Sequence, residues 1–151
     1  MWLSEQFEKN HKENEYLIML GKGEYEEELR HKTNNNIICP GFVEDVNGYM
    51  SIADIYVSAS KSEGLPLSVL QAMSNGLYLL LSKIPPHAEI INENNDIGTL
   101  FSENNFSKRY RDSINKSRSV DRRNIIDIQI NNYSVHTMCE GYEKLYTEVL
   151  V

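Results

Sequence analysis

The segment SASKSEGLPLSVLQAMSNG, residues 58–76, is the strongest indication in the sequence of how this chain folds. Its pattern is typical of a strand end, a polar loop, a helix and a turn in direct succession. Pro66 suits the first position of a helix, because its missing N–H group needs no partner there. Asn75 and Gly76 favour the end of that helix, since both tolerate the left-handed backbone that often closes helices.

The loop between the strand and the helix is a candidate anion site. Gly64 lets the backbone approach a ligand closely, and we expect the free N–H groups of Leu67 and Ser68 to face the carboxyl edge of the sheet. Lys61 offers a positive charge, and Ser60 offers a further hydrogen-bond donor. On spacing alone, an ordinary helix cap is the simpler interpretation, and the anion site is the alternative.

Short apolar runs and helical patterns alternate on both sides of this segment, which predicts an α/β fold. We expect a single domain over residues 1–151, a Rossmann-like three-layer α/β/α sandwich with a five-stranded parallel sheet. The expected strands are residues 16–20, 37–39, 54–58, 77–81 and 99–101. The expected helices are residues 2–12, 24–32, 46–52, 66–75, 86–92 and 105–116, followed by helix alone over the last 30 residues.

Composition excludes several classes of protein. The 151 residues contain 15 Lys and Arg against 22 Asp and Glu, a formal net charge of -7, so we expect no general affinity for nucleic acid. Cys39 and Cys139 have no second cysteine or paired histidine nearby, so neither a metal site nor a disulfide scaffold is indicated. The longest apolar run, residues 77–81, is far shorter than the ~20 residues of a membrane helix.

The C-terminal helical region carries an apolar stripe at helical spacing, which something must cover. Its members are Val135, Met138, Cys139, Tyr142, Leu145, Tyr146 and Val149. We expect the stripe to pack on the core of the chain itself. The alternative is a surface for another domain or subunit.

Six segments in order resemble the C-terminal half of a nucleotide-sugar-dependent glycosyltransferase of retaining family 4, which has the GT-B fold. They are LIMLGKG (17–23), IICPGFV (37–43), YMSIADIYVSAS (49–60), the strand region 76–82, EII (89–91) and GTLF (98–101). Each segment alone is a weak signal. Six of them in the family's order, over nearly the whole chain, are a strong one.

Several site residues are implied by this resemblance. In the family, two glutamates eight positions apart flank the motif helix, and the first contacts the donor sugar while the second contacts the nucleotide ribose. Here the first is Glu63, the catalytic position, and the second position holds Gln71, which still hydrogen-bonds a ribose hydroxyl but lacks the charge. A turn beside the base and a loop around the diphosphate complete the implied donor site: Phe42, Val43, Ser60, Lys61, Gly64, Leu65, Pro66 and Leu67.

The implied activity is transfer of a sugar, with retention, from a nucleotide diphosphate sugar to a glycan or lipid-linked acceptor, without metal or other cofactor. Such a transfer depends on positioning and on stabilising charge on the leaving diphosphate, so Glu63 orients the sugar rather than attacking it. The implied location is the cytoplasm, including the inner face of the membrane. The alternative from another class is a non-catalytic, flavodoxin-like nucleotide-binding or regulatory module.

The resemblance begins at the second strand of the family's C-terminal domain. Residues 1–151 show no counterpart of the family's first C-terminal strand, whose loop brings an Arg and a Lys to the donor phosphates, or of its N-terminal acceptor domain. We therefore expect little or no transferase activity from this chain alone, and nucleotide dissociation constants on the order of 0.1 to 1 mM. The partner would be the missing N-terminal domain or a second subunit, a homodimer included.

The absent strand lies at the centre of the family's sheet, of order 3-2-1-4-5-6, between residues 16–20 and 54–58. Unpaired backbone groups at that place would cost roughly 1–3 kcal/mol each. We expect the two strands to close up and pair, which gives the order 2-1-3-4-5. The alternative is a strand from a partner chain inserted between them.

Overall fold

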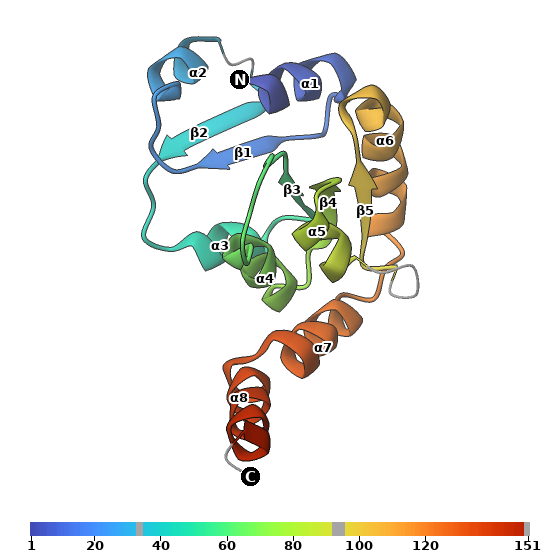
Figure 1. Cartoon of the computed structure of the whole chain (residues 1–151). Helices are drawn as coiled ribbons and strands as arrows, with labels where there is room; N and C mark the ends of the chain where they lie inside the picture. The colour runs from blue at the N-terminus through green and yellow to red at the C-terminus, as the bar shows by residue number, and fades with distance from the viewer. Residues whose placement is uncertain (33–34, 92–95, 150–151) are drawn as a thin grey trace.

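A computed structural model describes residues 1–32, 35–91 and 96–149, and its elements alternate as predicted (Figure 1). The strands are β1 (Leu17–Leu20), β2 (Ile37–Gly41), β3 (Ile55–Ser58), β4 (Tyr78–Ser82) and β5 (Gly98–Phe101). The helices are α1 (Trp2–Asn10), α2 (Glu26–Lys32), α3 (Val46–Ser51), α4 (Leu67–Ser74), α5 (Pro85–Ile90), the 3-10 turn η1 (Glu103–Asn105), α6 (Phe106–Ser117), α7 (Arg122–Tyr133) and α8 (Val135–Val149). Every expected strand and helix is present, and the described ends differ from the expected ones by at most two residues; Asn92, the expected end of the helix over 86–92, lies outside the described residues.

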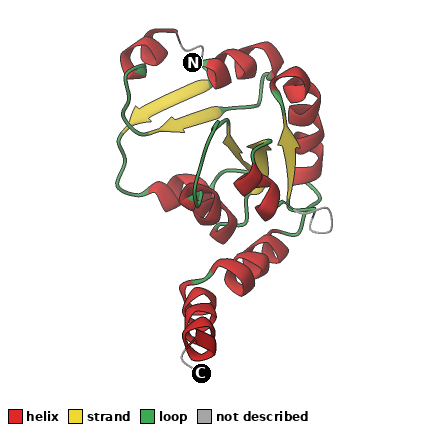
Figure 2. Cartoon of the chain, in the orientation of Figure 1, coloured by secondary structure: helices red, strands yellow, loops and turns green. Residues whose placement is uncertain are grey.

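The strands form two separate parallel sheets (Figure 2). In one, β1 pairs with β2, with Leu17 opposite Ile37. In the other, β3, β4 and β5 pair in that order, with Ile55 opposite Tyr78. The expected α/β architecture with parallel strands is confirmed, whereas the expected single sheet of order 2-1-3-4-5 is wrong, because β1 and β3 do not pair.

Side-chain contacts with α1 and α6 fix the position of β1, which packs in one apolar cluster with β3 but does not pair with it. Leu17 is buried with Phe7 and Ile37 in one apolar cluster. Just before β1, Glu15 accepts hydrogen bonds from Arg111 of α6. Moving β1 sideways to pair with β3 at the ~4.8 Å spacing of a sheet would break these contacts. Closure of the gap would therefore sacrifice packing that the open arrangement keeps.

Two apolar clusters cover the opposite faces of the three-stranded sheet, and β4 contributes to both. Leu79 and Leu81 face the cluster formed with α4 and α7, whereas Leu80 faces the cluster formed with α1 and α6. Side chains alternate between the faces of a strand, so β4 is buried on both sides. This is the layering expected of an α/β/α sandwich.

The helix α4 ends where the sequence predicts. Asn75 is its C-cap, and Gly76 follows with a left-handed φ of 70°. A Cβ atom on Gly76 would lie 2.9 Å from the Cβ and the carbonyl oxygen of Arg122, because α7 passes directly over the turn. Glycine is needed here both for its backbone conformation and for its small size.

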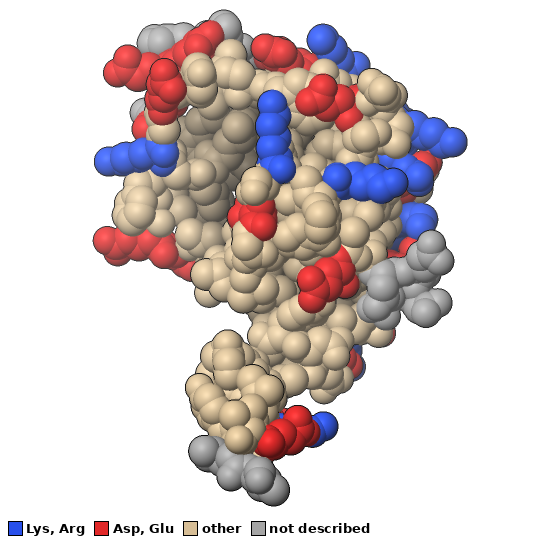
Figure 3. All heavy atoms as spheres, in the orientation of Figure 1, with Lys and Arg blue, Asp and Glu red and all other residues tan. Residues whose placement is uncertain are grey.

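The C-terminal stripe does not pack on the core, so that expectation is wrong. Ile125 of α7 is fully buried, but α8 has no buried residue and extends beyond α7 (Figure 1). The chain turns away at Ser134, whose backbone is extended between the two helices. The face of α8 seen in Figure 3 is almost free of charged side chains. The exposed stripe residues are Val135, Met138, Cys139, Tyr142, Leu145, Tyr146 and Val149.

Candidate functional site

Serine hydrogen bonds hold the loop that follows β3 at the carboxyl edge of the sheet. The Oγ of Ser58 donates to the Oγ of Ser60 at 3.2 Å, and Ser60 in turn donates to the Oε1 of Glu63 at 2.6 Å. The carbonyl of Ser60 accepts from the Oγ of Ser82, at the end of β4, at 2.5 Å. The loop that carries Glu63 is thus bound to two neighbouring strands, at the edge where open α/β sheets bind ligands.

A buried histidine positions Ser82 in turn. The Nδ1 of His87, which is fully buried in α5, donates to the carbonyl oxygen of Ser82 at 2.9 Å and lies 3.2 Å from its Oγ. The Nε2 of His87 is also buried and has no hydrogen-bond partner in the described part of the chain. His87 therefore fixes the end of β4 beneath the loop.

The helix α4 begins one residue later than predicted, and one of its amides is not free. Pro66 is the N-cap, not the first helical residue, and is buried. The N–H of Leu67 donates to the carbonyl of Leu65 at 2.9 Å, so the expectation that it faces a ligand unpaired is wrong. The N–H of Ser68 has no partner among residues 1–32, 35–91 and 96–149, and it remains open to a ligand.

The other predicted loop residues lie on the surface. Lys61 and Glu63 are exposed, and so are the apolar side chains of Leu65 and Leu67, at 60% and 69%. A Cβ atom placed on Gly64 would meet no other atom within 4 Å. Open space therefore lies in front of this loop, and a ligand can approach the backbone closely.

Gln71 lies further along α4, against α3. Its Nε2 donates to the Oδ1 of Asn47 at 3.1 Å, and the Nδ2 of Asn75 donates to the same oxygen at 3.2 Å. Asp45 caps α3 by accepting from the N–H of Gly48 at 2.8 Å. The amide nitrogen of Gln71 thus holds α3 and α4 together, and its Oε1 is the atom that can accept from a ligand.

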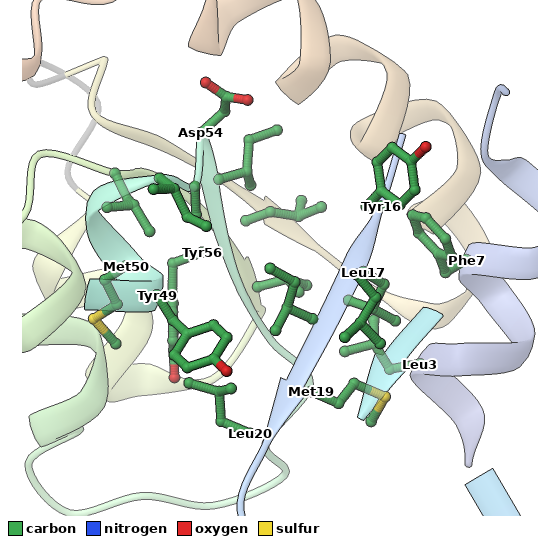
Figure 4. Close-up of a pocket in the computed structure, with 18 of the residues that line it drawn as sticks. Leu3, Phe7, Tyr16, Leu17, Met19, Leu20, Tyr49, Met50, Asp54 and Tyr56 are labelled. Carbon is green, nitrogen blue, oxygen red and sulfur yellow. The ribbon is translucent and has the colours of Figure 1, made fainter. Parts of the chain in front are cut away.

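A cavity of about 1230 Å³ opens beside these residues, between β1 and β3 (Figure 4). Phe42, Val43 and Gln71 line it, whereas Glu63 and the rest of residues 60–67 do not. The predicted binding residues therefore form two groups, one in the cavity and one on the exposed loop. The groups meet at Ser68, which lines the cavity at the start of α4.

Tyr56 connects the cavity to the start of α4, and no role was predicted for it from the sequence. Its ring lines the cavity, and its hydroxyl donates to the Oγ of Ser68 at 2.8 Å. Burial raises the pKa of Tyr56, a hydrogen bond with Ser68 acts in the opposite direction, and the negative charge of Glu63 raises the pKa further. Its hydroxyl therefore stays protonated at neutral pH. The signal available in the sequence was a tyrosine between two aliphatic residues of a strand, Ile55 and Val57.

Three lysines follow strands of the two sheets. Lys22, Lys61 and Lys83 are exposed and follow β1, β3 and β4, so all three lie toward the carboxyl edge of the strands. Within the described residues, no group of His, Cys, Asp and Glu side chains is arranged to hold a metal ion. No described helix is long and apolar enough to cross a membrane.

Comparison with known proteins gives a family match. The model of the family described as "Glycosyl transferases group 1" matches residues 1–117. An uncharacterized glycosyltransferase of Haemophilus influenzae is 26% identical over 137 residues, which are 87% of this chain and 35% of the relative. The UDP-Gal:alpha-D-GlcNAc-diphosphoundecaprenol alpha-1,3-galactosyltransferase of Escherichia coli is 23% identical over 144 residues, 89% of this chain and 37% of the relative. The chain therefore spans about a third of the length of these relatives.

Solved structures share the fold. Anabaena Alr3699/HepE in complex with UDP superposes with a TM-score of 0.77 at 16% identity, covering 97% of this chain and 44% of that protein. WaaG, a glycosyltransferase involved in lipopolysaccharide biosynthesis, has a TM-score of 0.70 at 17% identity, covering 88% and 39%. At such low identity these likenesses establish a common fold.

Proposed function

Because the chain belongs to the group 1 glycosyl transferases, whose model matches residues 1–117, we propose that it forms the nucleotide-sugar-binding half of a retaining glycosyltransferase with the GT-B fold. One observation carries this proposal. The Ser60–Glu63 hydrogen bond, at 2.6 Å, holds a carboxylate on the exposed loop between β3 and α4. A loop that only capped the helix would not need a second hydrogen bond from Ser82 to hold Ser60 in place.

The diphosphate is proposed to lie against the start of α4. The N–H of Ser68 has no protein partner, and Gly64 leaves open space for a phosphate to approach the backbone. Lys61 is exposed next to this space and supplies positive charge. Leu65, Pro66 and Leu67 form the adjoining wall.

The sugar and the nucleoside are proposed to contact the two groups of predicted residues. The Oε1 of Glu63 accepts from Ser60, which leaves the other carboxylate oxygen for a sugar hydroxyl. The Oε1 of Gln71 accepts from a ribose hydroxyl while its Nε2 holds Asn47. Phe42 is 66% exposed and, with Val43, borders the base.

The proposed reaction breaks the bond between the anomeric carbon and the β-phosphate oxygen. A new bond to the acceptor oxygen forms on the same face of the sugar, and the acceptor proton passes to the departing diphosphate. No side chain forms a covalent bond, so the protein contributes positioning and stabilisation of negative charge. Lysine and backbone donors supply that stabilisation, and we propose that the reaction needs no metal or other cofactor.

The acceptor is proposed to be a glycan or a lipid-linked sugar. The Escherichia coli relative is named for an acceptor joined to diphosphoundecaprenol, and the Anabaena structure is titled as a complex with UDP. The lipid-linked acceptor in the first name supports a reaction beside a membrane, which we propose to be its cytoplasmic face, and the second name makes uridine the first base to test. We propose that an N-terminal domain or a second subunit binds the acceptor, and that residues 1–151 alone transfer little sugar.

Nitrogen-15 NMR titration of the whole chain with UDP, GDP and UDP-glucose tests the proposal. We expect saturable shifts at Ser60, Glu63, Ser68 and Gln71, with dissociation constants on the order of 0.1 to 1 mM, and weaker shifts with uridine. Shifts at α8 alone, or none, would contradict the donor site. If UDP-glucose binds no differently from UDP in both the native chain and Glu63→Gln, the non-catalytic nucleotide-binding module is favoured instead.

A further inference from the structure

Three side-chain amides of α3 and α4 meet beside the cavity. They belong to Asn47 of α3 and to Gln71 and Asn75 at the C-terminal half of α4, and the two helices lie side by side (Figure 1). The Oδ1 of Asn47 accepts from the Nε2 of Gln71 at 3.1 Å and from the Nδ2 of Asn75 at 3.2 Å. Of the three residues, Gln71 alone lines the cavity. Its amide is therefore the one that a ligand in the cavity can reach.

The surroundings of Asn75 decide which end of its amide is the nitrogen. A side-chain amide has an oxygen that accepts and a nitrogen that donates, and a half-turn of the group exchanges the two. The Nδ2 of Asn75 donates to the backbone carbonyl of Gln71 at 2.9 Å and lies 3.9 Å from the sulfur of Met50. Both neighbours are acceptors, so an oxygen in this place would have no donor. The orientation of the Asn75 amide is thereby fixed by the backbone.

This fixed nitrogen sets the other two amides in turn. The Nδ2 of Asn75 has a second hydrogen, so Asn47 presents its oxygen to it and not its nitrogen. That oxygen only accepts, so Gln71 presents its Nε2 to Asn47. The Oε1 of Gln71 is consequently the end of the amide that remains for a ligand. A chain of three amides thus transmits the orientation of one backbone carbonyl to the cavity.

The first turn of α3 holds Asn47 in place, although its side chain is exposed. Asp45 caps this turn by accepting from the N–H of Gly48 at 2.8 Å. A Cβ atom on Gly48 would collide with the carboxylate of Asp45, so glycine is what allows the cap to lie so close. The Oγ of Ser51 donates to the carbonyl of Gly48 at 2.7 Å. The backbone on both sides of Asn47 is therefore anchored, and its Oδ1 is kept against α4.

The arrangement is matched to glutamine at position 71. A glutamate there would present only oxygens to Asn47, which would have to rotate and offer its nitrogen. That nitrogen would then face the nitrogen of Asn75, with hydrogens on both groups and no acceptor between them. Glutamine satisfies all three amides together. This is a physical reason for Gln71 at the position where the resembling family has a glutamate.

We propose that Asn47 is a positioning residue of the donor site, which orients the amide of Gln71 so that its oxygen accepts a hydrogen bond from a hydroxyl of the nucleotide ribose. The inference rests on the proposed function, because the ribose is the ligand group that brings a hydroxyl to Gln71. An oxygen that only accepts favours a ligand with a donor at that place. Asn47 thereby helps the site to select ribonucleotides over deoxyribonucleotides without contacting the ligand.

NMR titration of the whole chain with UDP, 2′-deoxy-UDP and 3′-deoxy-UDP tests the selection of a hydroxyl. We expect the native chain to bind at least one deoxy analogue about three- to tenfold more weakly than UDP, the effect of one neutral hydrogen bond. Asn47→Ala leaves the Gln71 amide free to rotate and should reduce this ratio to below about twofold. Asn47→Asp keeps an acceptor for both amide nitrogens and should retain the ratio. Asn115→Ala, at an exposed position of α6, is the matched control and should also retain it.

The orientation of Gln71 is measured separately, without nucleotide. One side-chain amide proton of Gln71 should exchange with water about threefold or more slowly than those of exposed Asn115, because it is hydrogen-bonded. Asn47→Ala should remove this protection, and Asn47→Asp should keep it. Absence of UDP binding would refute the proposed function, whereas the exchange rates decide independently whether Asn47 orients Gln71.

Four outcomes would overturn the inference. Exchange at Gln71 that Asn47→Ala leaves unchanged would mean that Asn47 does not hold the amide. An unchanged preference for UDP in Asn47→Ala would mean that Gln71 is oriented without it. Equal loss in Asn47→Ala and Asn47→Asp would mean that an acceptor at position 47 is not the cause. A native chain that binds UDP and both deoxy analogues equally would mean that Gln71 selects no ribose hydroxyl.

Discussion

Arg111 of α6 binds the carboxylate of Glu15 through both oxygens, with Nη1 donating to Oε1 at 2.8 Å and Nη2 to Oε2 at 2.9 Å. The hydroxyl of Tyr110 and the backbone N–H of Lys12 donate to the same carboxylate, each at 2.9 Å. Burial acts to raise the pKa of Glu15, but these donors together lower it to about 2. The loop before β1 is thereby held to a helix 96 residues further along the chain.

Acid should weaken the fold through Glu15. Its pKa is lower in the folded chain than the ordinary 4.5, so its contribution is full above pH 4.5 and is lost as the pH falls toward 2. We expect Glu15→Gln to lower the free energy of unfolding at pH 7 by roughly 1–3 kcal/mol and to flatten its pH dependence in that range. Urea melts at a series of pH values measure both effects, with Glu148→Gln on exposed α8 as the control. Parallel pH profiles for the native chain and Glu15→Gln would refute this account.

Gly76→Ala should destabilise the chain. The new Cβ would lie 2.9 Å from Arg122 on a residue with a left-handed φ of 70°. We expect a loss of about 1–3 kcal/mol in the free energy of unfolding, measured by urea denaturation. Gly23→Ala is the matched control, because no atom lies within 4 Å of its Cβ position, and its change should stay within about 0.5 kcal/mol. Equal effects of the two substitutions would contradict the close approach of α7.

The two C-terminal helices should differ sharply in their contribution to stability. Ile125 of α7 is 0% exposed, whereas Leu145 of α8 is 51% exposed. Ile125→Ala should cost about 2–5 kcal/mol, because it opens a cavity beneath α7. Leu145→Ala should change the free energy of unfolding by about 0.5 kcal/mol or less. Thermal and urea melts of both variants check this, and a large loss in Leu145→Ala would show that α8 is covered in solution.

Lys61→Ala should weaken nucleotide binding. The exposed ammonium of Lys61 follows β3 next to the open space at the start of α4, so it is the predicted partner of the diphosphate. Loss of one such charged hydrogen bond should raise the UDP dissociation constant about three- to tenfold. Calorimetry with Lys144→Ala, on α8, provides the matched control. Micromolar UDP binding that Lys61→Ala leaves unchanged would be inconsistent with this site.

Local sequence pattern was sufficient to predict the five strands, the helices α1 to α6 and helix over the last 30 residues, but not the break at Ser134 or the 3-10 turn η1. The run of Tyr78–Ser82 is uncharged because both of its faces are buried, and Gly76 marks a turn that only glycine fits. Whether β1 and β3 pair could not be predicted in the same way. The position of β1 depends on contacts with residues far along the chain, and neither segment alone indicates that Arg111 binds Glu15.

The candidate site shows the same division. The polar loop follows from a local pattern and the role of Gln71 from the family resemblance. The sequence does not reveal the turn in which the N–H of Leu67 donates to the carbonyl of Leu65. Tyr56 entered the site because α4 brings Ser68 within 2.8 Å of its hydroxyl. Contacts of this kind depend on helix placement rather than on residue spacing.

Division of the strands into two sheets reduces the cooperativity of unfolding. No ladder of backbone hydrogen bonds links β1 and β2 to the β3–β4–β5 sheet in the described chain, so the two parts are coupled by side chains alone. Protonation of Glu15 weakens that coupling, and so does loss of the edge contact between Phe7 of α1 and Tyr110 of α6. We therefore expect the β1–β2 pair to open before the sheet around β4, so that the molecule unfolds through a partly folded state.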